Sequence, residues 1–242
     1  MKTVKKLILG FIVIIFIFAL VIGLYFLIPH LGLKPAESGQ ILNTNIYAIK
    51  NDESTVFFIK IGSDYIMFDT GTNAKKLVAS LEEAGIQIDD VKWIFLTHSD
   101  PDHVAGLALF PHADIYMNAD ELPLLNGSKK RFYIVWNNSL PSGTSIDKIT
   151  FIQNQIFSLN EVKIECIKAP GHTIGSMVYL VNDQYLFTGD AIKVSNGSVK
   201  IHPFTMDTKQ GKRTIEQLRE TINKSSVILT AHYGYYEKLL FD

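Results

Sequence analysis

The sequence predicts an α/β layered fold preceded by one apolar helix, and three observations support this prediction. Short runs rich in β-branched and aromatic residues alternate with turn residues throughout residues 45–242. Amphipathic helical stretches are interleaved with these runs in both halves of that segment. Sheets covered by helices accommodate such a pattern, because each element buries its apolar face against another. Residues 7–28 form a separate run in which only Gly10 and Gly23 fall outside the apolar set.

The apolar run predicts a transmembrane anchor at residues 7–28. As a helix it would be about 33 Å long, enough to cross a hydrocarbon core of about 30 Å. A cleaved signal peptide would have a shorter apolar core and a small-residue cleavage site. Lysines precede the run, so we expect residues 1–6 in the cytoplasm and the remaining chain outside the cell membrane. These lysines are Lys2, Lys5 and Lys6.

Charge and cysteine content exclude some functions for the remaining chain. Of 23 Lys and Arg residues, three precede the apolar run, and with 24 Asp and Glu residues this leaves residues 29–242 a formal charge of −4. Nucleic-acid binding normally draws on a basic stripe, so we expect no nucleic-acid partner. Cys166 is the single cysteine, so no internal disulfide can form. Its place in a predicted strand indicates a buried side chain.

The first half of the predicted domain begins after a linker at residues 29–44, which mix Pro, Gly and polar residues. Strands are expected within residues 45–50, 54–60 and 64–69. A helix follows at 74–84, with Asn73 as its N-cap and Gly85 after its C-terminus. Next come a buried strand at 91–97, a short helix near 103–110, a strand at 113–118 and a helical stretch at 119–125.

The second half begins after an irregular insertion at residues 126–145. Strands are expected at 148–152, 162–168, 176–181 and 184–189. A polar loop then leads to an amphipathic helix near 207–223 and a last strand at 226–230. No internal repeat is visible, so residues 45–242 are predicted to form one domain.

The segment from Thr97 to His103 concentrates four potential metal ligands directly after the buried strand. They are His98, Asp100, Asp102 and His103. Two carboxylates and two imidazoles packed into one loop are costly to bury unless a positive charge lies between them, and a divalent cation supplies that charge. We therefore interpret this loop as part of a metal site.

Three further candidates each follow a later predicted strand. They are His172, Asp190 and His232. Sites in open α/β sheets lie at the carboxyl ends of strands, where loops converge. We therefore expect these three side chains to join the loop at one edge of the sheets.

The ordered set of ligands resembles the metallo-β-lactamase superfamily, whose usual motif is His-x-His-x-Asp-His followed by a distant His, Asp and His. The resemblance covers the chain from about residue 45 and implies an αββα sandwich with a dinuclear site. His98, Asp100 and His172 would hold the first ion, Asp102, His103 and His232 the second, and Asp190 would bridge them. Asp69 matches the family's aspartate behind the ligand loop, which orients it.

The sequence departs from the family motif at Asp100, which replaces the second histidine. An additional carboxylate reduces the net positive charge of a two-ion site. The resemblance implies zinc, whereas the additional oxygen ligand would favour Mn²⁺ or Fe²⁺. A single ion held by Asp102, His103, Asp190 and His232 is the alternative, because an aspartate reaches less far than a histidine.

Such a site predicts a hydrolase that acts on a small ester, lactone, thioester or amide, since paired ions lower the pKa of a shared water. Asp102 is the expected proton acceptor. One alternative is a phosphodiesterase or nuclease, and another is a non-hydrolytic di-iron or binding protein. The sequence leaves the substrate, the metal, the number of ions, the oligomeric state and any cleavage of the anchor open.

Several residues outside the motif are candidates for the substrate pocket. They are Tyr133, Trp136, Lys193, His202 and Tyr233. Of these, His202 is expected to have a structural role. His30 and His112 have no motif around them.

Overall fold

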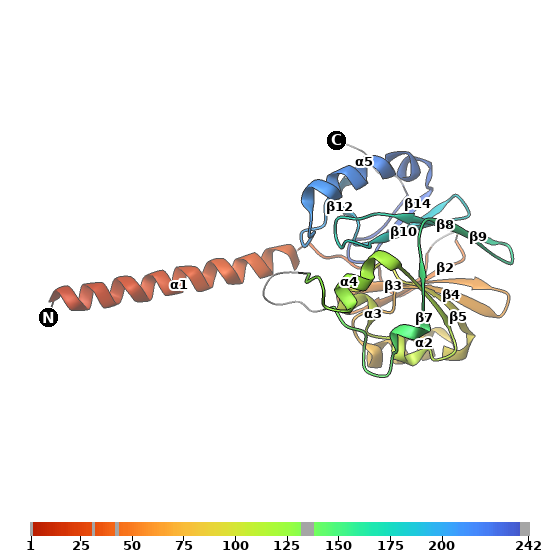
Figure 1. Cartoon of the computed structure of the whole chain (residues 1–242), viewed down its shortest axis with the longest axis horizontal. Helices are drawn as coiled ribbons and strands as arrows, with labels where there is room; N and C mark the ends of the chain where they lie inside the picture. Colours follow the sequence, from red (N-terminus) through yellow and green to blue (C-terminus); the bar gives the residue numbers. More distant parts are fainter. Residues whose placement is uncertain (1, 31, 42–43, 132–137, 238–242) are drawn as a thin grey trace. The chain divides into compact units, whose positions relative to one another are not determined.

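The computed structural model describes residues 2–30, 32–41, 44–131 and 138–237, and divides the chain into the units Met1–Leu33 and Lys34–Asp242 (Figure 1). The first unit consists mainly of helix α1 (Lys2–His30), which contains the predicted membrane span. Within the described part of the chain, no helix has both the length and the apolar character needed to cross a membrane. The predicted span at 7–28 is therefore not supported by the structure.

The second unit is built on two large sheets. The first sheet has seven strands in sequence order. These are β1 (Gly39–Gln40), β2 (Ile46–Asn51), β3 (Ser54–Ile61), β4 (Asp64–Phe68), β5 (Val91–Phe95), β6 (Asp114–Asn118) and β7 (Ile149–Ile152). The pairs from β1 to β4 are antiparallel, and those from β4 to β7 are parallel. The parallel half brings the carboxyl ends of β4 and β5 to the same edge.

The second sheet has six strands in the order β15-β14-β11-β10-β9-β8. They are β8 (Gln155–Leu159), β9 (Val162–Lys168), β10 (Met177–Val181), β11 (Tyr185–Gly189), β14 (Val227–Thr230) and β15 (Gly234–Tyr236). Strands β11 and β14 are parallel, so their carboxyl ends also share an edge. A separate hairpin pairs β12 (Lys193–Ser195) with β13 (Ser198–Lys200).

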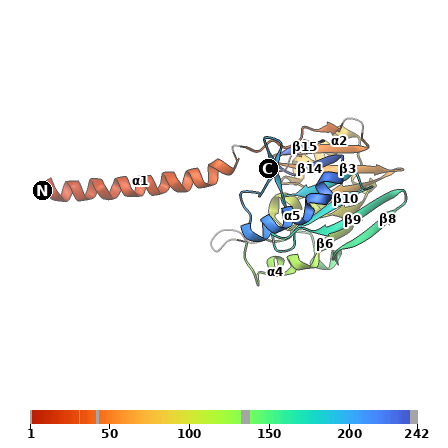
Figure 2. The ribbon, with the colours of Figure 1, turned by 90° about the horizontal axis from the view of Figure 1, so that it is seen from above.

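Helices cover the outer faces of both sheets, which makes the unit an αββα sandwich (Figures 1 and 2). Helix α2 (Ala74–Ala84) buries Leu77 and Leu81 against the first sheet. Helix α5 (Thr208–Lys224) buries Leu218 and Ile222 against the second. The shorter helices are α3 (Pro101–Val104), α4 (Leu122–Leu125), η1 (Ile88–Asp90), η2 (Leu107–Leu109), η3 (Ala119–Glu121) and η4 (Ile146–Lys148).

The main core lies between the two sheets. Phe68 of the first sheet stacks on Phe187 of the second, with ring centroids 3.9 Å apart. Phe95 meets Tyr179 edge to face at 5.4 Å. Cys166 is buried in the same core, as predicted, and burial raises the pKa of its thiol to about 12. β4, which leads to Asp69, and β5, which leads to the ligand loop, are thus anchored in this core.

Several predicted elements are confirmed and several strands were missed. Asn73 caps α2 by accepting a hydrogen bond from the backbone N–H of Lys76, and Gly85 follows the helix with φ 70°. Strands β8, β12, β13 and β15 were not predicted, and β1 lies within the expected linker at 29–44. β8 was missed because its pattern mixes polar and apolar residues, and it is largely exposed.

Candidate metal centre

Each candidate ligand follows directly or closely on the carboxyl end of a strand, as the sequence predicts. Asp69 follows β4, the loop from His98 to His103 follows β5, His172 follows β9, Asp190 follows β11 and His232 follows β14. Because these strands are held rigidly in the sandwich core, their loops meet at one edge of the unit. Side chains from distant parts of the sequence therefore lie within contact distance there.

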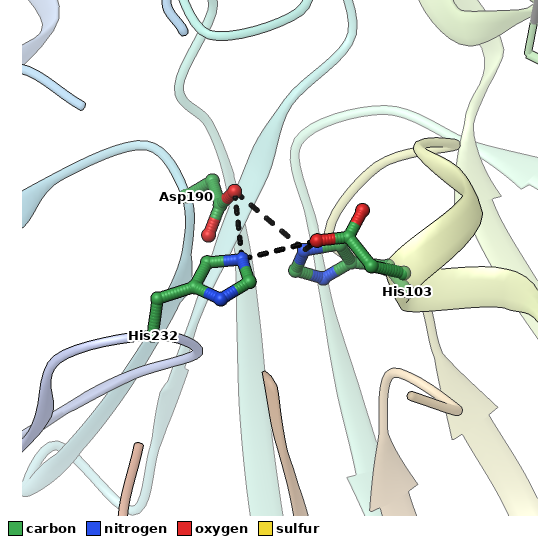
Figure 3. Close-up of side chains that lie close together, drawn as sticks. His103, Asp190 and His232 are labelled. Atoms are coloured by element: carbon green, nitrogen blue, oxygen red, sulfur yellow. Dashed lines mark ion pairs between the residues drawn. The ribbon is translucent and has the colours of Figure 1, made fainter. Parts of the chain in front are cut away.

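Four of the predicted ligands gather into one cluster. Single ligand atoms of Asp102, His103, Asp190 and His232 all lie within 4.8 Å of one another. The Nε2 atom of His232 is 3.2 Å from an oxygen of Asp102 and 3.2 Å from an oxygen of Asp190. The Nε2 atom of His103 is 3.6 Å from the same two oxygens. Figure 3 shows the side chains of His103, Asp190 and His232 converging.

Hydrogen bonds on the far side of the two imidazoles orient their Nε2 atoms toward the cluster. His103 Nδ1 is 2.8 Å from a carboxylate oxygen of Asp69, and His232 Nδ1 is 2.8 Å from the backbone carbonyl of Glu53. Both partners only accept, so Nδ1 carries the proton in each ring and the neutral ring has its lone pair on Nε2. Among the described residues, His103 Nε2 has no hydrogen-bond partner although it is buried. This arrangement fits a divalent cation.

Asp69 holds the ligand loop from behind. Its carboxylate accepts hydrogen bonds from the Thr97 backbone N–H at 2.7 Å and from the Thr97 hydroxyl at 2.8 Å, besides the bond to His103. Its backbone has φ 58°, in the left-handed region that residues other than glycine seldom adopt. This conformation turns the chain sharply at the end of β4 and places the carboxylate beneath the loop.

Glycine is required at two close approaches beside the ligand segments. A Cβ at Gly189, which has φ 48°, would collide with the Thr97 side chain. A Cβ at Gly171, next to His172, would lie 2.6 Å from the Cα of Gly211 in α5. The first approach packs the segment before Asp190 against the ligand loop, and the second packs the His172 loop against α5.

The predicted first-ion ligands form a second, different cluster. Ligand atoms of His98, His172 and Asp190 lie within 4.8 Å of one another. Asp100 lies beside them, with one oxygen 3.4 Å from His98 Nε2 and 3.2 Å from His172 Nε2. The seven predicted ligands are thus brought together at one edge of the sandwich.

An arginine that the sequence analysis did not single out enters this second cluster. Arg131 is 3% exposed, and its Nε donates to both oxygens of Asp100 at 3.0 and 2.9 Å. Its Nη2 lies 2.7 Å from Nε2 of His172. Burial opposes ionisation of Asp100, but His98 and the Arg131 guanidinium outweigh it and hold the pKa of Asp100 well below its usual range.

The cluster of four ligands pairs two imidazoles with two carboxylates. Burial opposes ionisation of Asp102 and Asp190, but nearby histidines lower the pKa of both carboxyls. Burial also opposes protonation of His103 and His232, but the carboxylates around them raise both pKa values, that of His232 to about 10. The raised histidine pKa values and the lowered carboxyl pKa values thus have the same cause, the close pairing of imidazoles with carboxylates.

Comparison with known proteins gives the family. The family model described as "Metallo-beta-lactamase superfamily" matches residues 49–220. The chain belongs to this superfamily. A protein of Methanocaldococcus jannaschii named "Probable metallo-hydrolase" is 25% identical over 72% of this chain and 75% of its own length. A "Probable hydroxyacylglutathione hydrolase" of Encephalitozoon cuniculi is 26% identical over 75% of this chain and 65% of its own.

A solved structure has the same fold. An archaeal metallo-β-lactamase superfamily protein from Sulfolobus tokodaii matches with a TM-score of 0.60 and 22% identity, covering 80% of this chain and 82% of the other. Together with the ligand cluster, membership of the superfamily makes this chain a metal-dependent hydrolase that binds a divalent cation.

Residues outside the superfamily motif also shape the centre. His202 was expected to have a structural role; it is 5% exposed, and its Nε2 lies 3.6 Å from an Asp190 oxygen. Burial lowers the pKa of His202 to about 4 although the nearby Asp190 opposes this, so the ring is neutral at pH 7. In the sequence, only the position of His202 between Asp190 and His232 indicated that it could lie near the metal centre.

One of the predicted pocket residues, Tyr233, lies beside His202, and a second, Lys193, lies beside Tyr233. The ring centroid of Tyr233 is 5.8 Å from that of His202, and the Lys193 ammonium is 5.8 Å from the Tyr233 centroid. Tyr133 and Trp136 lie outside the described residues. His112 is exposed, in agreement with its lack of a motif.

Glu121 was not predicted, and it links two ligand loops from a fully buried position. Its carboxylate accepts from the Ser99 backbone N–H at 2.9 Å and from the Gly175 backbone N–H at 2.8 Å, and it also bonds the Ser99 hydroxyl. One carboxylate thus joins the loop after β5 to the loop that carries His172. No sequence motif surrounds Glu121, so only the fold reveals its role.

Proposed function

We propose that this metal-dependent hydrolase cleaves the acyl bond of a small ester, lactone, thioester or amide. The observation that carries the proposal is the cluster of Asp102, His103, Asp190 and His232, whose ligand atoms lie within 4.8 Å of one another. These four residues would hold a divalent ion, and such an ion would supply an activated water for attack on a carbonyl carbon.

The chain's own residues have distinct roles in this reaction. Asp190, which is 4% exposed, is the ligand shared by both histidine groups. Asp102 has a side chain that is 35% exposed, so it is the ligand most open to water and substrate. We assign it as the acceptor of the proton that the attacking water releases. His103 and His232 would serve as neutral ligands, oriented by Asp69 and by the Glu53 carbonyl.

Within the acyl substrates we favour a thioester. The relative from Encephalitozoon cuniculi is named for hydroxyacylglutathione, an acyl thioester of a small thiol. A thiolate is a good leaving group and needs little protonation as it departs. This suits a centre in which the partly exposed Asp102 is the only carboxylate of the ion-binding cluster that water reaches readily.

A substrate panel tests the reaction class. The zinc-loaded full chain would be assayed with an acylglutathione, an aryl ester, a lactone, a β-lactam and bis-p-nitrophenyl phosphate. We expect turnover of acyl substrates, with the thioester fastest. Turnover of the phosphodiester alone would support the phosphodiesterase alternative, and an iron-loaded protein with a redox-active visible spectrum but no hydrolysis would support the non-hydrolytic one.

The variant Asp102→Ala tests the role of the proton acceptor. It should reduce kcat by at least about 10²-fold, the usual range for loss of general base catalysis, while the fold is retained. Asp89→Ala is the matched control, because Asp89 is exposed and lies outside the centre. Unchanged turnover of Asp102→Ala would contradict the assigned role.

For the identity of the ion we propose zinc. Two imidazole nitrogens with two carboxylate oxygens form a donor set that zinc accepts readily. The case for Mn²⁺ or Fe²⁺ depended on Asp100 as an additional oxygen ligand, and Asp100 instead bonds the guanidinium of Arg131. Metal analysis of protein purified without added metal would test this, and bound manganese or iron in place of zinc would contradict it.

We also propose that residues 7–28 anchor the enzyme in the cell membrane with the hydrolase unit outside the cytoplasm. This proposal rests on the sequence alone, because a run of this length with no polar face is stable only when it is surrounded by apolar groups. Alkaline carbonate washing of cell membranes, followed by protease treatment of intact cells, would test it. Release by carbonate would contradict anchoring, and protection from protease would contradict the orientation.

A further inference from the structure

The guanidinium of Arg131 lies where the superfamily resemblance implies the first metal ion. We propose that Arg131 replaces that ion, so that the chain binds one divalent cation, at Asp102, His103, Asp190 and His232. This inference rests on the proposed hydrolase site, since the same four ligands hold the ion in both. It differs from the two-ion site that the resemblance implies, because His98, Asp100 and His172 then hold no ion.

The carboxylate of Asp100 is already hydrogen-bonded to Arg131 and Asn138. Arg131 Nε donates to both of its oxygens, and the side-chain amide of Asn138 donates to one of them at 2.9 Å. Asn138 is itself 4% exposed, and its amide also donates to the Ser99 hydroxyl at 2.8 Å. The Asp100 charge is therefore neutralised by a buried, permanently protonated group. A ligating Asp100 would have to give up this pairing.

The ring of His172 also contacts Arg131. A guanidinium can only donate, so the contact with Arg131 Nη2 at 2.7 Å engages the Nε2 atom of His172 as an acceptor, and the same Nε2 atom also lies 3.2 Å from an oxygen of Asp100. That acceptor is the ring lone pair which would otherwise bind a metal. Arg131 thus contacts Asp100 and His172, which are two of the three residues that the resemblance assigns to the first ion.

Spacing alone would permit an ion here, because His98, His172 and Asp190 have ligand atoms within 4.8 Å. Charge argues against it. An ion bonded to His172 Nε2 would compete with a guanidinium nitrogen that is 2.7 Å from the same atom. Two like charges that close, in a site shielded from water, repel strongly. The pair of Arg131 and Asp100 is already neutral, so no further cation is needed there.

Metal counting tests the inference without reference to activity. The metal-free full chain would be titrated with Zn²⁺ against a chromophoric chelator, and bound zinc would be measured after dialysis. We expect one equivalent per chain, with any second equivalent at least about 100-fold weaker. Two tight equivalents in the wild-type protein would overturn the inference. No tight zinc at all would overturn the proposed function instead.

A double variant tests the inference through an expected gain of zinc binding. Asp100→His with Arg131→Ala restores the family's His-x-His-x-Asp-His motif and removes the guanidinium, so it should bind two equivalents of zinc. The single variant Arg131→Ala should bind a second equivalent more weakly than the double variant. Arg213→Ala is the matched control, since Arg213 is exposed on α5 and bonds Gln210, and it should bind one equivalent.

The double variant also discriminates between the causes of single-ion binding. If it folds with wild-type circular dichroism and still binds one equivalent, Arg131 is not what excludes the second ion, and the inference fails. If it does not fold, the wild-type stoichiometry and that of Arg131→Ala still decide. Cobalt substitution gives a second readout, because a second Co²⁺ ion would add to the visible absorption per chain.

Discussion

Zinc binding to the metal-free centre should release about two protons per ion at pH 7.5. The carboxylates around His103 and His232 raise both pKa values, that of His232 to about 10, so both rings are protonated at this pH. Asp102 and Asp190 are already ionised because their pKa values are lowered. A dication that takes both Nε2 lone pairs must therefore displace two protons, and the net charge of the cluster does not change.

The sign of the pH dependence follows from these raised pKa values. Protons compete with the ion below the raised pKa of each histidine, which for His232 is about 10, so zinc binding should weaken as pH falls, by about 100-fold per unit where two protons are displaced. Histidines with an ordinary pKa of about 6.5 would be mostly neutral at pH 7.5 and would together release only about 0.2 protons. Ionisation of the bound water would add up to about one proton in either case.

Calorimetric titration with Zn²⁺ in three buffers of different ionisation enthalpy measures the number directly. We expect between two and three protons per ion, and His232→Gln should release about one fewer because glutamine carries no proton. A wild-type value near one or below would refute the reasoning, since it would mean that the metal-free cluster does not hold its two imidazolium groups.

Three further substitutions test parts of the centre separately. Asp69→Asn should weaken zinc affinity by about 10- to 100-fold, because it removes the acceptor behind the ligand loop; competition with a chelator measures this, and unchanged affinity would argue against its orienting role. Glu121→Gln should lower the free energy of unfolding by about 2 kcal/mol through loss of charged acceptors, as urea denaturation would show, with no change expected if the loops are held by other contacts. His202→Gln should lower kcat while one equivalent of zinc is retained; loss of zinc would instead make His202 a ligand.

The fold and the motif residues could be predicted from the sequence because both depend on local pattern. The strands that end at Asp69, His98, His172, Asp190 and His232 are buried runs bounded by turn residues, and this pattern marks them without knowledge of the partner strand. The structure then brings all the candidate ligands to one edge. The pattern failed at β8 and at the short strands, where pairing with a neighbour supplies what the residues themselves do not indicate.

Arg131 and Glu121 could not be predicted because their roles depend on contacts distant in sequence. Arg131 lies 31 residues from Asp100 and 41 residues from His172, and Glu121 lies 54 residues from Gly175. Arg131 also belongs to the insertion at 126–145, which has no periodicity to indicate a buried side chain. A buried arginine is exceptional unless it is paired, so burial and pairing had to be seen together.

The burial of Asp100 and the burial of Arg131 can be understood only when the two residues are considered as a pair. An aspartate in place of the second motif histidine, without Arg131, would add a buried charge next to His98 and His172 and would favour a cation there. An arginine without Asp100 would leave an uncompensated guanidinium that is 3% exposed, which costs several kcal/mol. Together they are neutral and keep Nε2 of His172 engaged. The substitution at residue 100 is therefore best understood as one half of a pair, whose other half lies in the least regular segment of the sequence.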